Sequence, residues 1–431
     1  MKISRLLIAA LGLMTSASLG QAAEVAVAPF YQAAATLKAE GPLGTVLAKE
    51  EVPTAIPNAQ AWRIAYVSSD VAGNRTISTG LVIAPKGDAP AGGRPILAWA
   101  HGTTGTAQNC GPSQVLDPAQ ELNEYFLIGG TSWTDFGVPA ATAFIAKGYV
   151  LVATDYQGLG GGGVHQYAMA ASNGRDVINS VRAAGSMGLS GNARQAAVYG
   201  WSQGGGATIA AASLKDYIGE TGTAFDGISF VGFVAMAPQD VAVLIPPGAT
   251  EDAAANKMMA ELAAAFSDTV FNFTHYAMSM WAMPAAFPEL KFTDIFTADG
   301  AAKLDEIFAK KCMHAAADTI SFAMGETFKS AIKPQPDNAA AWVKALAKAS
   351  VEPVVPVAPV IVYFGNKDVT VNPVMGAMYQ KQMCGMGGNV ARVQLPGEQS
   401  HFTTPPAAQP LFVPWIDDRF AGKPLENGCP K

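Results

Sequence analysis

The sequence predicts a mixed α/β fold, in which a mostly parallel, doubly wound sheet is interrupted by a helical cap. Short apolar runs, typical of strands buried on both faces, alternate with stretches of helical period. Between residues 239 and 350 the alternation stops, and the chain becomes rich in Ala, Met and Phe with a helical pattern. The predicted organisation is a signal peptide (1–23), an N-terminal arm (24–61), a first core part (62–238), an inserted cap (239–350) and a second core part (351–431).

The first 23 residues have the pattern of a secretory signal peptide. Lys2 and Arg5 precede a short apolar run, residues 6–13, and small residues follow. We expect cleavage between residues 20 and 23. The apolar run is too short to span a bilayer, so the mature protein is expected to be secreted or periplasmic.

Composition narrows the class of protein. Of 431 residues, 50% are hydrophobic and 14% charged, which leaves a large apolar surface to bury. The formal charge of −6 offers no basic surface for nucleic acid. The spacing of the cysteines fits no metal site but fits two disulfides, with three connectivities open, among Cys110, Cys312, Cys384 and Cys429.

The strands are expected in a regular succession along the chain. A β-hairpin with Gly73-Asn74 in its turn opens the core, and helices are expected at 138–147 and 167–184. Between 24 and 61 the sequence shows no strong period. The expected strands are 62–67, 77–83, 95–100, 149–154, 196–199, 229–237, 357–364 and 390–395.

A glycine-flanked serine follows one of these strands. Gly200-Trp201-Ser202-Gln203-Gly204 has the G-x-S-x-G pattern between a predicted strand and a predicted helix. Such a turn holds the serine in a strained backbone conformation and projects its hydroxyl clear of the sheet. Ser202 is therefore the candidate nucleophile.

A serine nucleophile needs a base, and the base needs a carboxylate to orient it. His401 follows the last predicted strand, and Asp368 follows the strand before it. Parallel strands end at one edge of the sheet, so both loops are expected beside Ser202. Asp240, which follows strand 229–237, is the rival acid.

The oxyanion of the reaction needs two backbone donors. In folds of this kind the residue after a His-Gly pair supplies one, which predicts the N–H groups of Thr103 and Gln203. His101 is then structural, and the remaining histidines are interpreted as structural or cap residues: His165, His275 and His314.

These motifs together resemble the secretory lipase family of α/β-hydrolases, which has fungal and bacterial members. The resemblance rests on residues 99–105, 154–160 and 200–205 and on the Asp368 and His401 loops. It implies hydrolysis of carboxylic esters through an acyl-enzyme, a helical lid and no cofactor. It also implies that Cys110 pairs with Cys312 and Cys384 with Cys429.

The cap is expected to form an apolar pocket for esters with medium or long acyl chains. It is rich in flexible or aromatic apolar side chains: Met258, Met259, Phe266, Phe271, Phe273, Met278, Met280, Trp281, Met283 and Phe287. The expected partners are a small-molecule or lipid ester and, transiently, a lipid interface, without an obligate protein partner. A serine peptidase, an acyltransferase of the same fold and a non-catalytic binding module are the alternatives.

Overall fold

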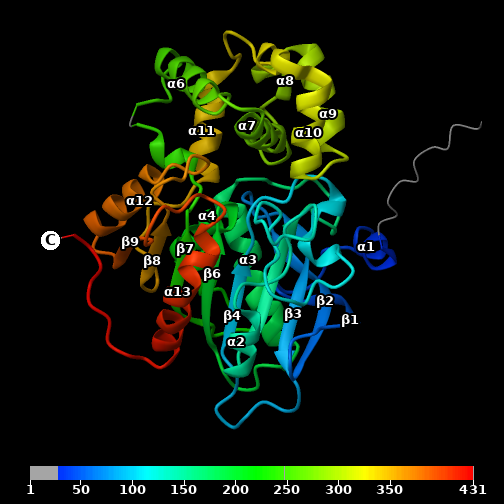
Figure 1. Cartoon of the computed structure of the whole chain (residues 1–431), viewed down its shortest axis with the longest axis vertical. Coiled ribbons are helices and arrows are strands. Elements are labelled where there is room, and N and C mark those ends of the chain that lie inside the picture. The colour runs from blue at the N-terminus through cyan, green and yellow to red at the C-terminus, as the bar shows by residue number, and fades with distance from the viewer. Residues whose placement is uncertain (1–27, 247, 431) are drawn as a thin grey trace, which may run out of the picture.

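The computed structural model describes residues 28–246 and 248–430. A sheet with helices on both sides forms the body of the molecule, and a helical cap lies over one end of the strands (Figure 1). The predicted signal peptide and its cleavage region lie outside the described residues.

The sheet has the predicted mixed, mostly parallel architecture. Its nine described strands run in the order β1-β2-β3-β5-β4-β6-β7-β8-β9. The pairs β1–β2, β2–β3 and β3–β5 are antiparallel, and every later pair is parallel. The strands are β1 (Val46–Val52), β2 (Ala59–Ser69), β3 (Arg75–Pro85), β4 (Ile96–Ala100), β5 (Val150–Gln157), β6 (Gln195–Trp201), β7 (Ser229–Met236), β8 (Val360–Phe364) and β9 (Val390–Gln394).

The N-terminal arm contributes more regular structure than its sequence shows. It contains a short helix, α1 (Pro29–Ala34), and the edge strand β1. In β1 the residues Lys49, Glu50 and Glu51 are all exposed, so the strand lacks the apolar alternation that marks a half-buried strand. An edge strand with charged side chains also resists pairing with another chain.

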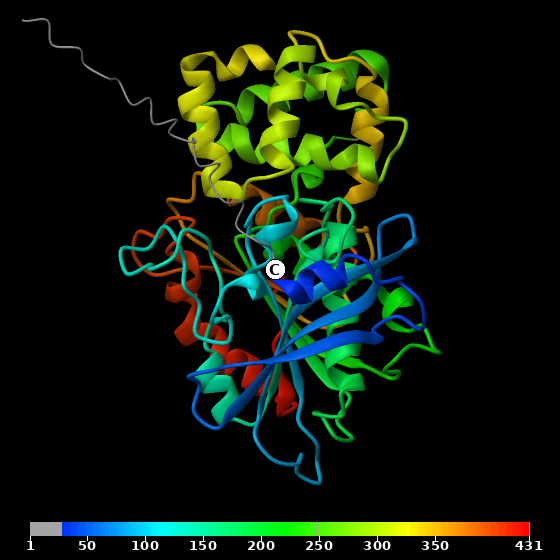
Figure 2. The same cartoon turned by 90° about the vertical axis from the view of Figure 1, so that its right-hand side faces the viewer.

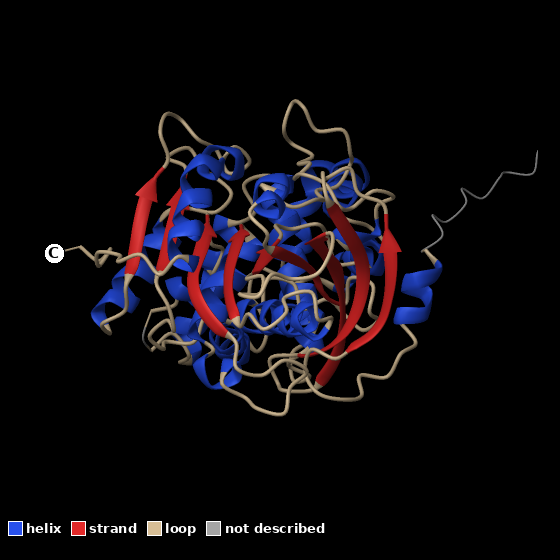
Figure 3. Ribbon diagram, turned by 90° about the horizontal axis from the view of Figure 1, so that it is seen from below, coloured by secondary structure: helices blue, strands red, loops and turns tan. Residues whose placement is uncertain are grey.

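Helices cover both faces of the sheet (Figure 3). One face packs against α3 (Ala170–Ser186), α4 (Gln203–Ser213) and α12 (Val374–Gly385). The other packs against α2 (Ala141–Ala146) and α13 (Thr404–Phe420). The two apolar cores therefore hold the parallel strands rigidly between them. A short helix, α5 (Lys215–Ile218), follows α4.

The cap is inserted between β7 and β8 and lies above the body of the molecule (Figure 2). It has an apolar core of its own. None of the helices in the described ranges combines the length and apolarity needed to cross a membrane. The cap helices are α6 (Asp252–Ala265), α7 (Val270–Ala282), α8 (Phe292–Ile295), α9 (Ala298–Phe308), α10 (Met313–Met324) and α11 (Ala339–Ala349).

Candidate active site

Ser202 occupies a sharp turn between β6 and α4. Its φ of 59° and ψ of −119° lie in a region that side chains rarely adopt, which costs of order 1–3 kcal/mol. Three backbone hydrogen bonds hold the turn. The Ser202 N–H donates to the Met236 carbonyl (2.9 Å), and the Ser202 carbonyl accepts from Gly206 (3.0 Å) and Gln239 (3.1 Å).

The glycines after Ser202 allow the helix to approach the sheet closely. A Cβ atom on Gly204 would collide with the Ala100 carbonyl at the end of β4. A Cβ on Gly206 would collide in the same way with the carbonyl of Gln239. The run of glycines is therefore explained by packing, since any side chain would push α4 away from the strand ends.

The structure brings His401 and Asp368 to Ser202. The His401 Nε2 atom lies 2.9 Å from Ser202 Oγ, and His401 Nδ1 lies 2.7 Å from Asp368 Oδ2. Because a carboxylate can only accept, Nδ1 carries the proton and Nε2 is free to accept from the serine hydroxyl. All three side chains are buried. The Trp201 indole N–H donates to the His401 carbonyl (3.1 Å) and so anchors the loop.

Asp368, and not its rival Asp240, contacts the imidazole. The second Asp368 oxygen, Oδ1, accepts backbone N–H groups from Thr370 (3.0 Å) and Val371 (2.8 Å), which orient the carboxylate. Asp240 instead accepts the hydroxyl of Ser350, with both carboxylate oxygens 2.7 Å from its Oγ. Burial raises the pKa of Asp240.

The predicted oxyanion donors flank Ser202. Gln203 follows it directly, and Thr103 lines a small cavity together with Ser202. Within residues 28–246 and 248–430, neither the Thr103 nor the Gln203 backbone N–H donates to a protein group, so both are available to an oxyanion. Tyr167 holds the Thr103 side chain, with 2.8 Å between Oη and Oγ1. No motif in the sequence pointed to Tyr167.

Two of the other histidines, His101 and His165, are buried and form hydrogen bonds to residues near Ser202. His101 contacts the carbonyls of Gly102 (2.5 Å) and Asp155 (3.3 Å), and burial lowers its pKa to about 4. The Nε2 atom of His165 accepts from the Gln203 side-chain amide at 3.1 Å, and burial lowers the pKa of His165 to about 3. Both imidazoles are therefore neutral at neutral pH.

The other two histidines belong to the cap. His275 contacts the Phe271 carbonyl within α7, and His314 of α10 stacks on Tyr125 with 4.0 Å between ring centroids. Burial lowers both pKa values to about 4. Their places fit the interpretation of structural or cap residues.

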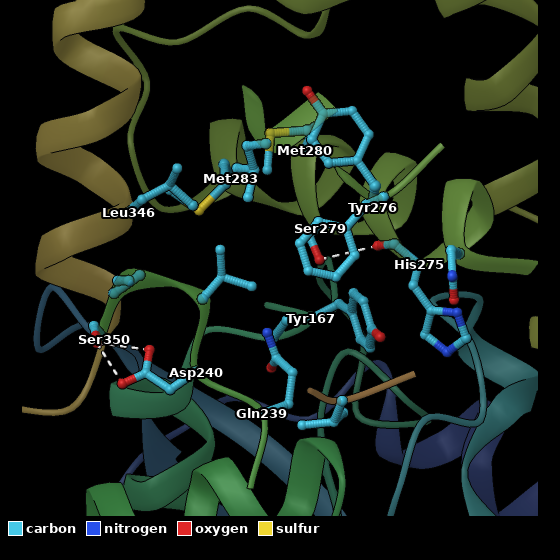
Figure 4. Close-up of a pocket in the computed structure, with 18 of the residues that line it drawn as sticks. Tyr167, Gln239, Asp240, His275, Tyr276, Ser279, Met280, Met283, Leu346 and Ser350 are labelled. Carbon is cyan, nitrogen blue, oxygen red and sulfur yellow. Dashed lines mark hydrogen bonds between the residues drawn. The ribbon is translucent and has the colours of Figure 1, made fainter. Parts of the chain in front are cut away.

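A large cavity extends from Ser202 into the cap. Its volume is about 70 Å³, and its wall combines core residues with side chains from α6, α7 and α11. Figure 4 shows Met283 and Leu346 on the opposite side of this cavity from Gln239 and Asp240. Since Gln239 bonds the Ser202 backbone, these two side chains lie at the end remote from the serine turn.

The apolar side chains noted in the cap divide into two groups. Three of them, Phe266, Met280 and Met283, line the large cavity. Most of the others belong to the core of the cap or pack against it. Phe271 also lines a second, smaller cavity of about 10 Å³, the side cavity, which contacts Ser202 and His401. The side cavity is lined by Thr103, Asp135, Trp201, Ser202, Phe271, His275, Met313, Thr370, His401 and Phe402.

The structure contains the two disulfides that the family resemblance implies. Cys110 is joined to Cys312 and Cys384 to Cys429, with Cα–Cα distances of 5.4 and 5.7 Å. The first links the loop after β4 to the start of α10, and the second links α12 to the C-terminal segment. Among the described side chains, no group of three or more His, Cys, Asp or Glu is arranged to hold a metal ion.

The sheet order, the inserted cap and the turn at Ser202 define an α/β-hydrolase fold of the kind found in lipases and esterases. The profile of the secretory lipase family matches residues 130–236 and 254–428, more than half of the chain. The chain therefore belongs to the secretory lipase family.

Individual relatives are distant in sequence. Lipase 9 of Candida albicans (strain SC5314 / ATCC MYA-2876) is 25% identical over 434 residues, which cover 93% of this chain and 84% of that protein. Lipase A of Candida antarctica in its closed state superposes with a TM-score of 0.67 at 18% identity, covering 94% of this chain and 89% of that one. The rice cell wall degrading esterase LipA from Xanthomonas oryzae gives a TM-score of 0.65 at 19% identity, covering 89% of this chain and 100% of that one. At such identities these structures show the common fold.

Proposed function

We propose that this protein is an exported serine esterase or lipase that cleaves carboxylic esters through an acyl-enzyme intermediate. The observation that carries the proposal is the hydrogen-bonded chain Ser202–His401–Asp368, buried at the base of an apolar cavity. Family membership and the names of the lipase and esterase relatives support ester chemistry. The disulfides and the predicted signal peptide support export.

In the proposed mechanism His401 acts first as a base. Its Nε2 accepts the Ser202 proton while Oγ attacks the ester carbonyl, and the Asp368 carboxylate stabilises the imidazolium that forms. The backbone N–H groups of Thr103 and Gln203 hold the oxyanion, each contributing about 2.7–4 kcal/mol in the transition state. The imidazolium then protonates the departing alcohol. Water activated by His401 releases the acid and restores the serine.

The large cavity is proposed to take the acyl chain. Its wall is apolar at the remote end, where Met280, Met283 and Leu346 lie, and such a wall suits a hydrocarbon chain. Asp240 and Ser350 are hydrogen-bonded to each other on the wall, and burial raises the pKa of Asp240, which favours its uncharged form beside a hydrocarbon chain. We therefore expect medium-chain or longer esters to be preferred over acetates.

A panel of p-nitrophenyl esters from acetate to palmitate, tested on the wild type and on Ser202→Ala, examines this proposal. The expected result is hydrolysis by the wild type with a maximum at medium or longer chains. Ser202→Ala is expected to lose at least about 10³-fold in kcat. Hydrolysis that survives the substitution would contradict the assignment of the nucleophile, and a maximum at acetate would contradict the acyl pocket.

A further inference from the structure

The side cavity beside the reacting groups has the size of a single water molecule. Its volume is about 10 Å³, and one water needs roughly 10–15 Å³ of such space and two to four polar partners. Ser202 and His401 both line the side cavity, and His275 reaches it from the cap. A water bound there therefore contacts the serine that carries the acyl group and the imidazole that acts as the base.

His275 has an unused hydrogen-bond acceptor. Its Nδ1 lies 2.9 Å from the Phe271 carbonyl, and because a carbonyl can only accept, Nδ1 carries the proton. The lone pair of its Nε2 is then free, and among the described residues no group donates to it. Nε2 belongs to the edge of the ring that is remote from the α7 backbone. The side chain projects from α7 beside Tyr167, with 6.5 Å between the ring centroids (Figure 4).

The environment keeps the His275 ring an acceptor during the reaction. Burial lowers the pKa of His275 to about 4, and a positive charge on His401 is a smaller cause in the same direction. The His275 imidazole is therefore neutral at neutral pH, and a proton taken up by His401 makes protonation of His275 still less favourable. His275 also lines the large cavity, so it lies where the proposed acyl site meets the side cavity.

We propose that the side cavity binds the water that hydrolyses the acyl-enzyme, and that Nε2 of His275 accepts one hydrogen bond of this water and so orients it. This inference rests on the proposed esterase function and adds a second protein group that holds the water. In the acyl-enzyme Ser202 has no hydroxyl proton, so Nε2 of His401 accepts the other hydrogen of the water. With both hydrogens held by imidazoles, the lone pairs of the oxygen are free to face the acyl carbon.

The step that follows is ordinary deacylation. The water oxygen forms a bond to the acyl carbon while the proton directed at His401 moves to its Nε2. The bond between the acyl carbon and Ser202 Oγ then breaks, Oγ takes the proton back from His401, and the acid leaves. His275 gains and loses no proton, so its contribution is confined to the position of the water.

The test measures the two half-reactions separately with p-nitrophenyl butyrate. Rapid quenching and mass spectrometry follow the butyryl group on Ser202 as it forms and decays. We expect His275→Phe, which keeps an aromatic ring but removes the acceptor, to slow the decay about tenfold or more. Formation should stay within about threefold of the wild type, because no water takes part in it. His314→Phe is the matched control, since His314 is a cap histidine that lines neither cavity, and it should alter neither step.

The outcomes separate this inference from the esterase proposal. If the wild type forms no butyryl-enzyme on Ser202 and cleaves no ester, both proposals fall. If it turns over on Ser202 but His275→Phe slows both steps equally or neither, only the role of His275 is overturned. Should His275→Phe not fold, a high-resolution crystal structure of the wild type decides. We expect one ordered water in the side cavity within hydrogen-bond distance of His275 Nε2, and a side cavity without that water overturns the inference.

Discussion

Cys110 and Cys312 are joined across a sequence separation of 202 residues, and their bond fastens the loop that carries Thr103 to the cap. Two further contacts lie beside it. The Met313 N–H donates to the Thr104 carbonyl (2.9 Å), and the Thr106 hydroxyl donates to the carbonyl of Phe308 (2.8 Å). The position of the proposed oxyanion donor thus depends directly on the docking of the cap.

Removal of this disulfide should lower both stability and activity. We expect Cys110→Ser with Cys312→Ser to reduce the free energy of unfolding by about 2–5 kcal/mol, because the bond restricts a very long loop in the unfolded chain. The matched control is Cys384→Ser with Cys429→Ser, whose separation of 45 residues predicts a smaller loss. Urea unfolding of both variants measures the difference, and an equal or larger loss in the control would contradict the account.

Substitution of each aspartate by asparagine should show which of them, Asp368 or Asp240, orients His401. Asp368→Asn is expected to lower kcat by about 10³–10⁴-fold, since the amide favours the wrong tautomer of His401. Asp240→Asn alters contacts with Ser350 and Val351, away from His401, and should lower kcat by less than about tenfold. Steady-state kinetics on one ester gives both values. The reverse order of the two losses would assign the relay to Asp240.

Filling the remote end of the large cavity should shorten the preferred acyl chain. Met283 lies at that end beside Leu346, so Met283→Trp removes room for the last carbons of a long chain (Figure 4). We expect kcat/KM to fall about tenfold or more for the longest esters and little for butyrate. Met386→Trp, which alters a side chain 39% exposed and outside the cavity, is the control. A uniform loss at every chain length would argue against an acyl site there.

The buried carboxyl of Glu124 should make stability depend on pH. Its pKa of about 9 lies above the ordinary value near 4.3, so the folded protein binds more protons than the unfolded chain between those limits. Stability from this group is therefore present at low pH and declines as pH rises. Between about pH 5 and 9, the free energy of unfolding of Glu124→Gln should rise relative to that of the wild type by up to about 1.4 kcal/mol per pH unit.

Urea unfolding at several pH values measures this gain. Glu326→Gln is the control, because Glu326 is exposed. A difference between Glu124→Gln and the wild type that stays constant across pH would show that Glu124 titrates normally.

The sequence was most informative where a local pattern has one structural meaning. Buried apolar runs such as 95–100 are typical of strands covered on both faces, and β4 lies where that run predicts. The glycines around Ser202 identified the turn because nothing larger fits against the Ala100 carbonyl. The strand-end positions of Asp368 and His401 led to the hypothesis of a relay. In the structure, His401 lies within hydrogen-bond distance of both Ser202 and Asp368.

Features set by tertiary contact were not visible in the sequence. β1 is an exposed edge strand, so its charged residues showed no period. The helical pattern of the cap does not distinguish side chains that line the cavity, such as Met283, from those that pack inside the cap, such as Phe273. Asp135 and Glu124 belong to a long loop without regular structure, and only folding buries both of them and brings Asp135 to the side cavity.

The central claim is that Ser202 is an activated nucleophile. Labelling the purified protein with a fluorophosphonate probe, followed by mass spectrometry of the labelled peptide, tests this claim most directly. We expect stoichiometric labelling on Ser202, which disappears in Ser202→Ala and slows strongly in His401→Ala. Labelling of a different serine, or none in a folded wild-type protein that retains both disulfides, would contradict it.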